Sequence, residues 1–196
     1  MTELDHGLFG VFDGVGAFPR SGEAAQLAAE VLAEAWRAQE LPPAAALLRG
    51  CERAELLIRQ RCLGATTATL AWIVERLLFY VSVGDSRLYH QPAGASSPVQ
   101  VTVDEGEGNL LFNVLGEGPD RHGSSVAPQR GTVPLSSGDK VILVTDGITG
   151  DFAPDLLTEE ELALAIAGAD PQRAAEQLVE IARKRDDRTA MVIFLD

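Results

Sequence analysis

Four aspartates stand at the ends of apolar runs that are typical of buried strands. Asp13 follows "LFGVF", Asp85 follows "FYVSVG", Asp146 follows "KVILVT", and Asp186 shortly precedes "RTAMVIFL". Buried carboxylates are costly unless they are paired or bind a metal ion. Oxygen ligands without a cysteine or histidine cluster favour Mg²⁺ or Mn²⁺ over zinc, and a pair of such ions can activate a water molecule for hydrolysis. Aspartate before glycine, as in Asp13-Gly14, is also a common turn former, so a metal site and simple turns both remain open.

The elements that must position these aspartates follow from periodicity and turn residues. Helical spacing predicts helices over 21–36, with Ser21 as N-cap, and over 44–61, 158–167 and 171–185. Apolar and β-branched runs predict strands over 8–12, 65–74, 77–83, 86–91, 99–103, 140–145 and 188–195. The strands from 65 to 103 are expected to form one meander, and residues 104–132 to form an irregular loop. This order favours an α+β fold with helices on antiparallel sheets, in a single domain over 1–196.

Composition narrows the classes of partner. The chain has 196 residues, 46% of them hydrophobic, and a net charge of −13. Such an acidic balance argues against nucleic-acid binding and suits either a protein that concentrates divalent cations or one that is simply soluble. No apolar stretch approaches the roughly 20 residues that span a membrane, and "MTELDHG" lacks the layout of a signal peptide. We therefore expect a cytoplasmic protein with neither a nucleic-acid nor a membrane partner.

Six ordered segments carry a resemblance to a known family. They are "FGVFDGVGA" (9–17), "GATTATLAWI" (64–73), "VSVGDSRLY" (81–89), "NVLG" (113–116), "GDKVILVTDGI" (138–148) and "RDDRTAMVIFL" (185–195). In this order the chain resembles the metal-dependent protein phosphatases of the protein phosphatase 2C family. The resemblance implies an antiparallel β-sandwich flanked by helix pairs on both faces, in four layers.

The resemblance also implies roles for particular residues. Asp13 resembles the carboxylate that bridges two Mn²⁺ or Mg²⁺ ions, with the Gly14 carbonyl as a further ligand. Asp146 and Asp186 resemble the remaining ligands of this pair, and Asp85 resembles a ligand of a third, weaker ion. A water that bridges the metals would attack phosphorus directly, which makes Asp13, Asp146 and Asp186 the catalytic residues. The implied substrate is a phosphoserine or phosphothreonine protein, modified by a Ser/Thr kinase in a bacterial signalling system.

The sequence also departs from the family pattern. The family strand that precedes "FGVFDG" carries an arginine for the substrate phosphate, and this chain begins only eight residues before Phe9. Arg20 is the candidate replacement for phosphate binding, although a solvated surface arginine explains it equally well. The family often places an aspartate four residues after the one at Asp146, but Gly150 stands there and the acid follows at Asp151. The third-metal site is therefore in question.

These departures leave two functional alternatives open, and a third possibility is that the sequence is part of a longer chain whose remainder supplies the strand. The chain is either an active phosphatase or a weak or inactive phosphatase-fold module that binds or regulates. The retained aspartates favour the enzyme, and the absent first strand favours the module. An unpaired sheet edge at that strand would invite self-association, so we expect a monomer or a weak dimer.

Overall fold

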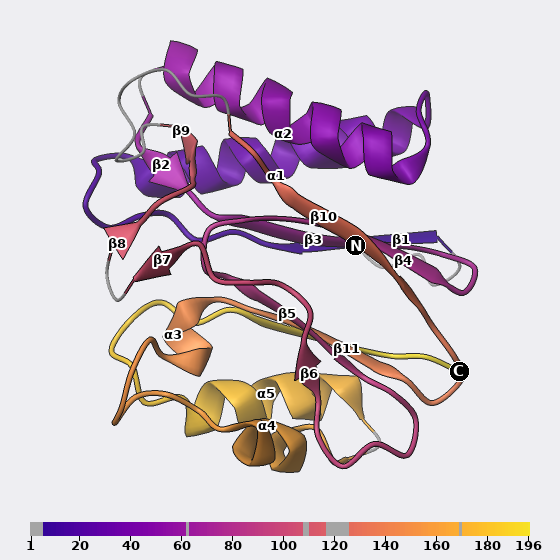
Figure 1. Ribbon diagram of the computed structural model, residues 1–196. Helices are drawn as coiled ribbons and strands as arrows, with labels where there is room; N and C mark the ends of the chain where they lie inside the picture. The colour runs from indigo at the N-terminus through magenta and orange to yellow at the C-terminus, as the bar shows by residue number, and fades with distance from the viewer. Residues whose placement is uncertain (1–5, 62, 108–109, 117–125, 169) are drawn as a thin grey trace.

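Two four-stranded antiparallel sheets face each other at the centre of the fold (Figure 1). The computed structural model describes residues 6–61, 63–107, 110–116, 126–168 and 170–196. The first sheet has the order β1 (His6–Val11), β3 (Ala68–Val74), β4 (Leu77–Val83), β10 (Gln129–Pro134). The second has the order β12 (Ala190–Phe194), β11 (Lys140–Val144), β5 (Arg87–Gln91), β6 (Val99–Gln100).

Helix pairs cover the outer faces of both sheets (Figure 1). Helices α1 (Ser21–Ala38) and α2 (Pro43–Gln60) lie on the first sheet, and α4 (Glu159–Ala165) and α5 (Pro171–Ile181) lie on the second. Shorter elements are α3 (Asp146–Thr149), the pair β2 (Ala65–Thr66) with β9 (Leu115–Gly116), and the pair β7 (Gly106–Glu107) with β8 (Leu110–Leu111). The four layers confirm the predicted α+β sandwich. Among the described helices, none is long and apolar enough to cross a membrane.

Apolar side chains fill all three interfaces between the layers. Leu70 and Trp72 of β3 pack with α1 and α2, whereas Leu143 of β11 lies between the two sheets. Leu178 of α5 packs on the outer face of the second sheet. Each fully buried leucine stabilises the fold by about 1.5–3 kcal/mol, so the sheets form a firm base for the loops at their edges.

The strand registers bring four loops to one edge of the sandwich. In the first sheet, Val11 at the end of β1 pairs with Thr69, and Val83 at the end of β4 pairs with Ala68. In the second sheet, Val144 at the end of β11 pairs with both Arg87 and Ala190, the first residues of β5 and β12. Each predicted aspartate follows or precedes one of these strand ends, so the registers decide that the carboxylates meet.

Three sequence-based expectations about strands and caps were wrong. The region 104–132, expected to be irregular, contains the short strands β7, β8 and β9 and the start of β10, and its residues 108–109 and 117–125 lie outside the described part of the chain. Strand β10 is an edge strand with alternating exposure, and its Gly131 and Pro134 obscure the strand pattern. Strand β5 does not continue the meander, because the turn after β4 carries the chain into the second sheet. The N-cap of α1 is Arg20 in a left-handed conformation, and Ser21 is the first helical residue.

The last helix is shorter than its periodicity predicts. Helix α5 ends at Ile181, and Ala182 already has an extended ψ of 136°. Residues 182–185, expected to be helical, therefore belong to the loop that leads to Asp186. The hairpin of β3 and β4 and the N-cap Thr158 of α4, which forms a capping box with Glu161, confirm the expectations for those segments.

Candidate metal centre

Asp13 leaves β1 with its backbone held by two threonines. Its N–H donates to Thr67 Oγ1 at 3.1 Å, and its carbonyl accepts from the Thr67 N–H at 2.8 Å and from Thr66 Oγ1 at 2.9 Å. Both threonines are buried. This bonding fixes the backbone of Asp13, so the direction of its carboxylate is set before any ligand binds.

Gly14 allows the next step of the chain to pass close to helix α1. A Cβ at this position would lie 2.7 Å from the carbonyl carbon of Ser21 and 2.9 Å from the nitrogen of Gly22. Any larger residue would therefore push the Asp13 loop away from the start of the helix. The close approach gives Gly14 a packing role in addition to the carbonyl ligand role that the resemblance implies.

The turn that carries Asp85 is fastened on both sides. Gly84 has a φ of +100°, and its N–H donates to Glu105 Oε2 at 3.1 Å. The Glu105 N–H returns a bond of 3.0 Å to the Gly84 carbonyl. On the other side, Ser86 Oγ lies 2.8 Å from Thr67 Oγ1, the same hydroxyl that accepts from Asp13. One buried threonine thus connects the loops of Asp13 and Asp85.

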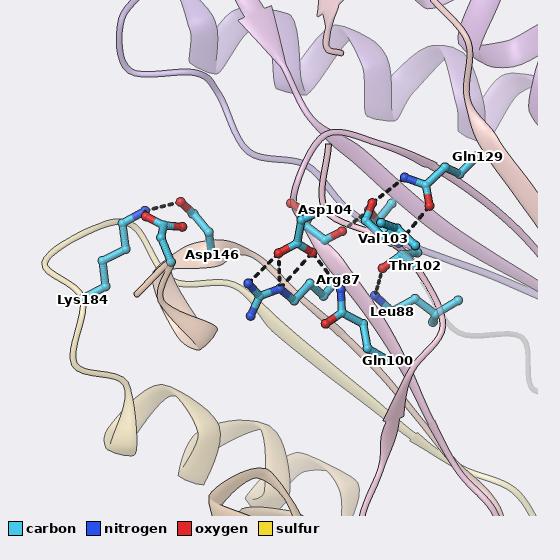
Figure 2. A network of polar contacts seen from close by, with 12 residues as sticks. Arg87, Leu88, Gln100, Thr102, Val103, Asp104, Gln129, Asp146 and Lys184 are labelled. Atoms are coloured by element: carbon cyan, nitrogen blue, oxygen red, sulfur yellow. Dashed lines mark hydrogen bonds and ion pairs between the residues drawn. The ribbon is translucent and has the colours of Figure 1, made fainter. Parts of the chain in front are cut away.

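A partly buried ion pair supports the start of β5 just after this turn (Figure 2). The Arg87 guanidinium donates to both oxygens of Asp104 at 2.6–3.0 Å, and Gln100 Nε2 donates to the same carboxylate at 2.7 Å. The Arg87 side chain is only 9% exposed. The network ties β5 to the segment after β6, so it stiffens the strand on which the Asp85 turn rests.

Asp146 is the first residue of the short helix α3, and the helix returns Asp151 towards it. Gly150 ends α3 with a φ of +70°, which turns the chain back at this point. One oxygen from each of Asp85, Asp146 and Asp151 lies within 4.8 Å of the others. The one-residue shift from Gly150 to Asp151 therefore does not remove the third carboxylate from this group, contrary to what the linear spacing suggested.

The predicted metal ligands share one cleft of about 600 Å³. Its lining comprises Asp13, Gly14, Val15, Gly16, Ala17, Ser21, Thr67, Asp85, Leu111, Asp146, Lys184, Asp186 and Asp187. Arg20 does not belong to this lining of described residues. Its guanidinium pairs with Glu23 at 2.8 Å on the surface of α1, with half of the side chain exposed. The fold thus brings together every predicted ligand, while Arg20 faces its helix neighbour.

The concentration of negative charge perturbs two of the carboxyls. Burial, followed by the nearby Asp146, raises the pKa of Asp13 to about 8. Burial and the charges of Asp146 and Asp151 raise the pKa of Asp85 to about 7. Asp146 Oδ1 is buried and, among the described groups, accepts no hydrogen bond. Hard carboxylate oxygens, one of them buried and unsatisfied, fit the needs of Mg²⁺ or Mn²⁺.

Lys184 is the functional-site residue that the sequence reasoning missed. Its ammonium forms an ion pair with Asp146 (Figure 2), and it also pairs with Asp151 at 3.1 Å and with Asp186 at 3.2 Å. Burial acts to lower the pKa of Lys184, but the hydrogen bonds to Asp146 and Asp151 outweigh burial and raise it. The sequence pattern places Lys184 within a predicted helix over 171–185. In the structure α5 ends at Ile181, so Lys184 lies in the loop that follows. The rarity of lysine could have drawn attention to this residue, because the chain contains only two lysines, Lys140 and Lys184.

Comparison with solved structures identifies the same architecture in bacterial phosphatases. The PPM Ser-Thr phosphatase MsPP from Mycobacterium smegmatis, solved in complex with cacodylate, is 26% identical with a TM-score of 0.80. The match covers 96% of this chain and 88% of that one. Serine/threonine phosphatase Stp1 from Staphylococcus aureus, at 19% identity and a TM-score of 0.80, covers 96% and 84% and shares the fold.

Sequence comparison agrees with the structural likeness. Protein phosphatase PhpP of Streptococcus pneumoniae is 30% identical over 51% of this chain and 47% of its own length. This chain thus spans about half the length of the curated relatives that it matches. The family model described as protein phosphatase 2C matches residues 3–183. A match over nearly the whole chain, together with the four-layer fold, shows that the chain belongs to the protein phosphatase 2C family.

Proposed function

We propose that the chain is a Mg²⁺- or Mn²⁺-dependent phosphatase that acts on phosphoserine or phosphothreonine proteins. The observation that carries this proposal is that Asp13, Asp85, Asp146 and Asp186 line one cleft, with Asp151 grouped beside Asp85 and Asp146. Asp13, Asp85, Asp146 and Asp186 belong to separate strand ends in the sequence, and the fold gathers them at one edge. Family membership supports the reaction class, and the cleft is large enough for a phosphorylated side chain.

The chemistry of the carboxylates suggests how they divide the work. Asp13, with the Gly14 carbonyl, Asp146 and Asp186 would hold a pair of ions, and the group of Asp85, Asp146 and Asp151 would hold a third, weaker one. Divalent ions bound here would activate a water molecule and neutralise charge on the phosphoryl group. Thr66 and Thr67 keep the Asp13 backbone in place, and the two ends of the Asp85 turn stay fastened to Glu105 and Thr67. The protein thereby supplies a rigid set of carboxylates at which the reaction can take place.

The alternative function, a weak or inactive phosphatase-fold module, is supported by the contacts of Lys184. The Lys184 ammonium lies among carboxylates that would otherwise hold metal, with ion pairs to Asp146, Asp151 and Asp186. A chain whose own cation neutralises the cluster suits a weak or inactive phosphatase-fold module that binds phosphoproteins or regulates a partner. The two candidates differ in metal-dependent turnover, so one assay separates them.

The first test is hydrolysis of a phosphothreonine peptide in Mn²⁺, in Mg²⁺ and in EDTA. The wild type is compared with Asp13→Asn and Asp146→Asn, which keep the shape of the side chain and remove its charge. The control variant Glu23→Gln, on α1, removes one exposed negative charge outside the cleft. We expect turnover that needs metal, survives in Glu23→Gln and falls at least about a hundredfold in both aspartate variants.

Absence of turnover in folded, metal-loaded wild type would favour the binding module. Equal turnover in EDTA would contradict metal dependence. Arg20→Met adds the test of phosphate binding, because a phosphate-binding arginine would raise KM for the peptide when removed. An unchanged KM would assign Arg20 to its surface pair with Glu23.

The cellular setting and assembly state are parts of the same proposal. We propose a cytoplasmic phosphatase, opposed to a Ser/Thr kinase, that exists as a monomer or a weak dimer. Strand β1 is at one edge of the first sheet in the order of described strands, and an open edge is a site for strand pairing. Light scattering over a range of concentrations measures this, and a constant monomer mass at high concentration would exclude the dimer.

A further inference from the structure

We propose that Lys184 is a built-in counter-cation of the acidic cluster, which a divalent metal ion must displace in order to bind. The inference rests on the metal binding proposed above and adds a residue that sets its strength. Its consequence is a centre whose metal affinity is lower than its carboxylates alone would give. The metal-free protein is in turn more stable than an uncompensated cluster would allow.

The position of the ammonium carries the argument. Lys184 Nζ contacts Asp146 Oδ2, lies 3.1 Å from Asp151 Oδ2 and lies 3.2 Å from Asp186 Oδ2. Figure 2 shows the side chain reaching across to Asp146 from the loop that precedes β12. The Lys184 side chain is only 18% exposed. The contacts are therefore those of a cation enclosed by three carboxylates and not of a surface pair.

Neighbouring arginines hold the Lys184 loop in this position. Arg188 donates to the Lys184 carbonyl at 3.0 Å and to the Val179 carbonyl at 3.2 Å, which fastens the loop to the last turn of α5. Arg183 pairs with Glu161 and donates to the Leu156 carbonyl at 3.0 Å. With its backbone fixed on both sides, Lys184 is presented to the cluster by the fold.

The ammonium and a metal ion compete for the same carboxylates. Asp146 and Asp151, which together with Asp85 form the group within 4.8 Å, are also two of the three partners of Lys184. A divalent ion binds carboxylate oxygen at about 2.0–2.2 Å, so an ion bound among these carboxylates competes with the ammonium for the space between them. Lysine has a flexible four-carbon stem, so the ammonium can move outwards to solvent when it is displaced.

The charges of the cluster favour displacement of the Lys184 ammonium by a divalent ion, although the displacement also breaks ion pairs. The cluster of Asp13, Asp85, Asp146, Asp151 and Asp186 offers five carboxyl groups to one lysine, so many of its oxygens are left for a divalent ion. Asp146 Oδ1 in particular is buried without a described hydrogen-bond partner. Metal binding therefore provides a partner for this unsatisfied oxygen but breaks the three ion pairs of Lys184. The two processes are coupled, and removal of the ammonium should strengthen metal binding.

The test compares Mn²⁺ binding by isothermal titration in the wild type, in Lys184→Gln and in Arg185→Gln. Arg185 is exposed, one residue from Lys184, and its loss changes the net charge by the same amount. We expect Lys184→Gln to bind Mn²⁺ about tenfold more tightly than Arg185→Gln, within the usual range of coupling between sites. We also expect Lys184→Gln to unfold at a lower temperature in EDTA and to gain more from Mn²⁺.

The outcomes separate this inference from the proposed function. Equal Mn²⁺ affinity in the three proteins overturns the inference and leaves the proposed phosphatase intact. Binding by Lys184→Gln alone supports the inference and contradicts metal dependence in the wild type. No binding by any of the three overturns both.

A second measurement uses the wild type alone, in case Lys184→Gln does not fold. The chain has only two lysines, so their acetylation by an amine-reactive acetylating reagent can be followed at both by mass spectrometry. Lys140 is the internal reference, because its ammonium donates to the Ile166 carbonyl at 2.5 Å and lies over the Phe194 ring, away from the cluster. We expect Mn²⁺ to accelerate the acetylation of Lys184 relative to Lys140. An unchanged or slower rate at Lys184 overturns the displacement.

Discussion

The hydroxyl of Thr67, a residue of the cleft lining, lies 2.8 Å from the buried hydroxyl of Ser86. Because Thr67 Oγ1 also accepts from the Asp13 N–H, this single contact joins the loop of Asp13 to the turn of Asp85. The two aspartates come from different parts of the chain, and both threonine and serine are buried. The relative position of the two loops is therefore held by a buried contact between two hydroxyls.

We expect Thr67→Val to weaken the centre more than it weakens the fold. Valine keeps the shape but leaves the Asp13 N–H and the Ser86 hydroxyl without this partner, at a cost of about 1–3 kcal/mol. Mn²⁺ affinity should fall as the Asp13 loop loosens, as measured by titration. Thr102→Val is the matched control, since buried Thr102 accepts only from the Leu88 N–H among the described contacts. Equal Mn²⁺ affinity in both variants would refute the positioning role.

In metal-free protein, Asp13→Asn should be more stable than the wild type at pH 8. The pKa of Asp13 is raised from 3.8 to about 8 by burial and by Asp146. A raised folded-state pKa means that the wild type loses stability as the pH rises from about 4 to 8, where the buried carboxyl ionises. Asparagine does not ionise, so its advantage should be several degrees at pH 8 and should shrink towards pH 4.

Thermal unfolding in EDTA across this pH range measures the effect. With Mn²⁺ present the order should reverse, because Asp13→Asn lacks a ligand for the ion. An advantage of Asp13→Asn that does not vary with pH would contradict the raised pKa.

Two arginine pairs should differ sharply in their contribution to stability. Arg87→Met leaves the Asp104 carboxylate without its enclosed partner and should cost about 3 kcal/mol, as broken buried ion pairs do. Arg20→Met removes a pair with Glu23 in which both side chains are more than half exposed, and should cost less than about 1 kcal/mol. Urea unfolding of the two variants gives the comparison. Similar losses in both would show that the network around Arg87 does not support the start of β5.

Gly147→Ala should damage the centre by separating two of its carboxylates. A Cβ at Gly147 would lie 1.9 Å from the Asp187 carbonyl oxygen, so the loop that carries Asp186 must move away from α3. Overpacking of this kind costs about 1–3 kcal/mol, and we expect Mn²⁺ affinity to fall as well. Gly22→Ala in α1 is the control, because a Cβ there meets nothing within 4 Å among the described atoms. The prediction fails if both alanine variants bind Mn²⁺ like the wild type.

The sequence by itself determined the strand ends and the residues placed on them. Asp13, Asp85, Asp146 and Asp186 could be found because apolar runs mark buried strands locally and an aspartate at their ends is visible in linear order. The same local signals predicted the helix pairs and the hairpin of β3 and β4. Ordered segments then carried the resemblance to the family. Periodicity is a property of neighbouring residues, so it survives without knowledge of the fold.

Only the tertiary structure decided which residues share the cleft. Asp151 joins Asp85 and Asp146 because α3 ends at Gly150 and turns back, and the pairing of β5 with β11 sets this edge. Lys184 enters the cluster because α5 stops at Ile181, four residues before its periodicity ends. Helical propensity favours continuation there, but the ion pairs with three distant carboxylates and the arginine contacts of the loop outweigh it. Such contacts join residues far apart in the chain, so local sequence patterns carry no record of them.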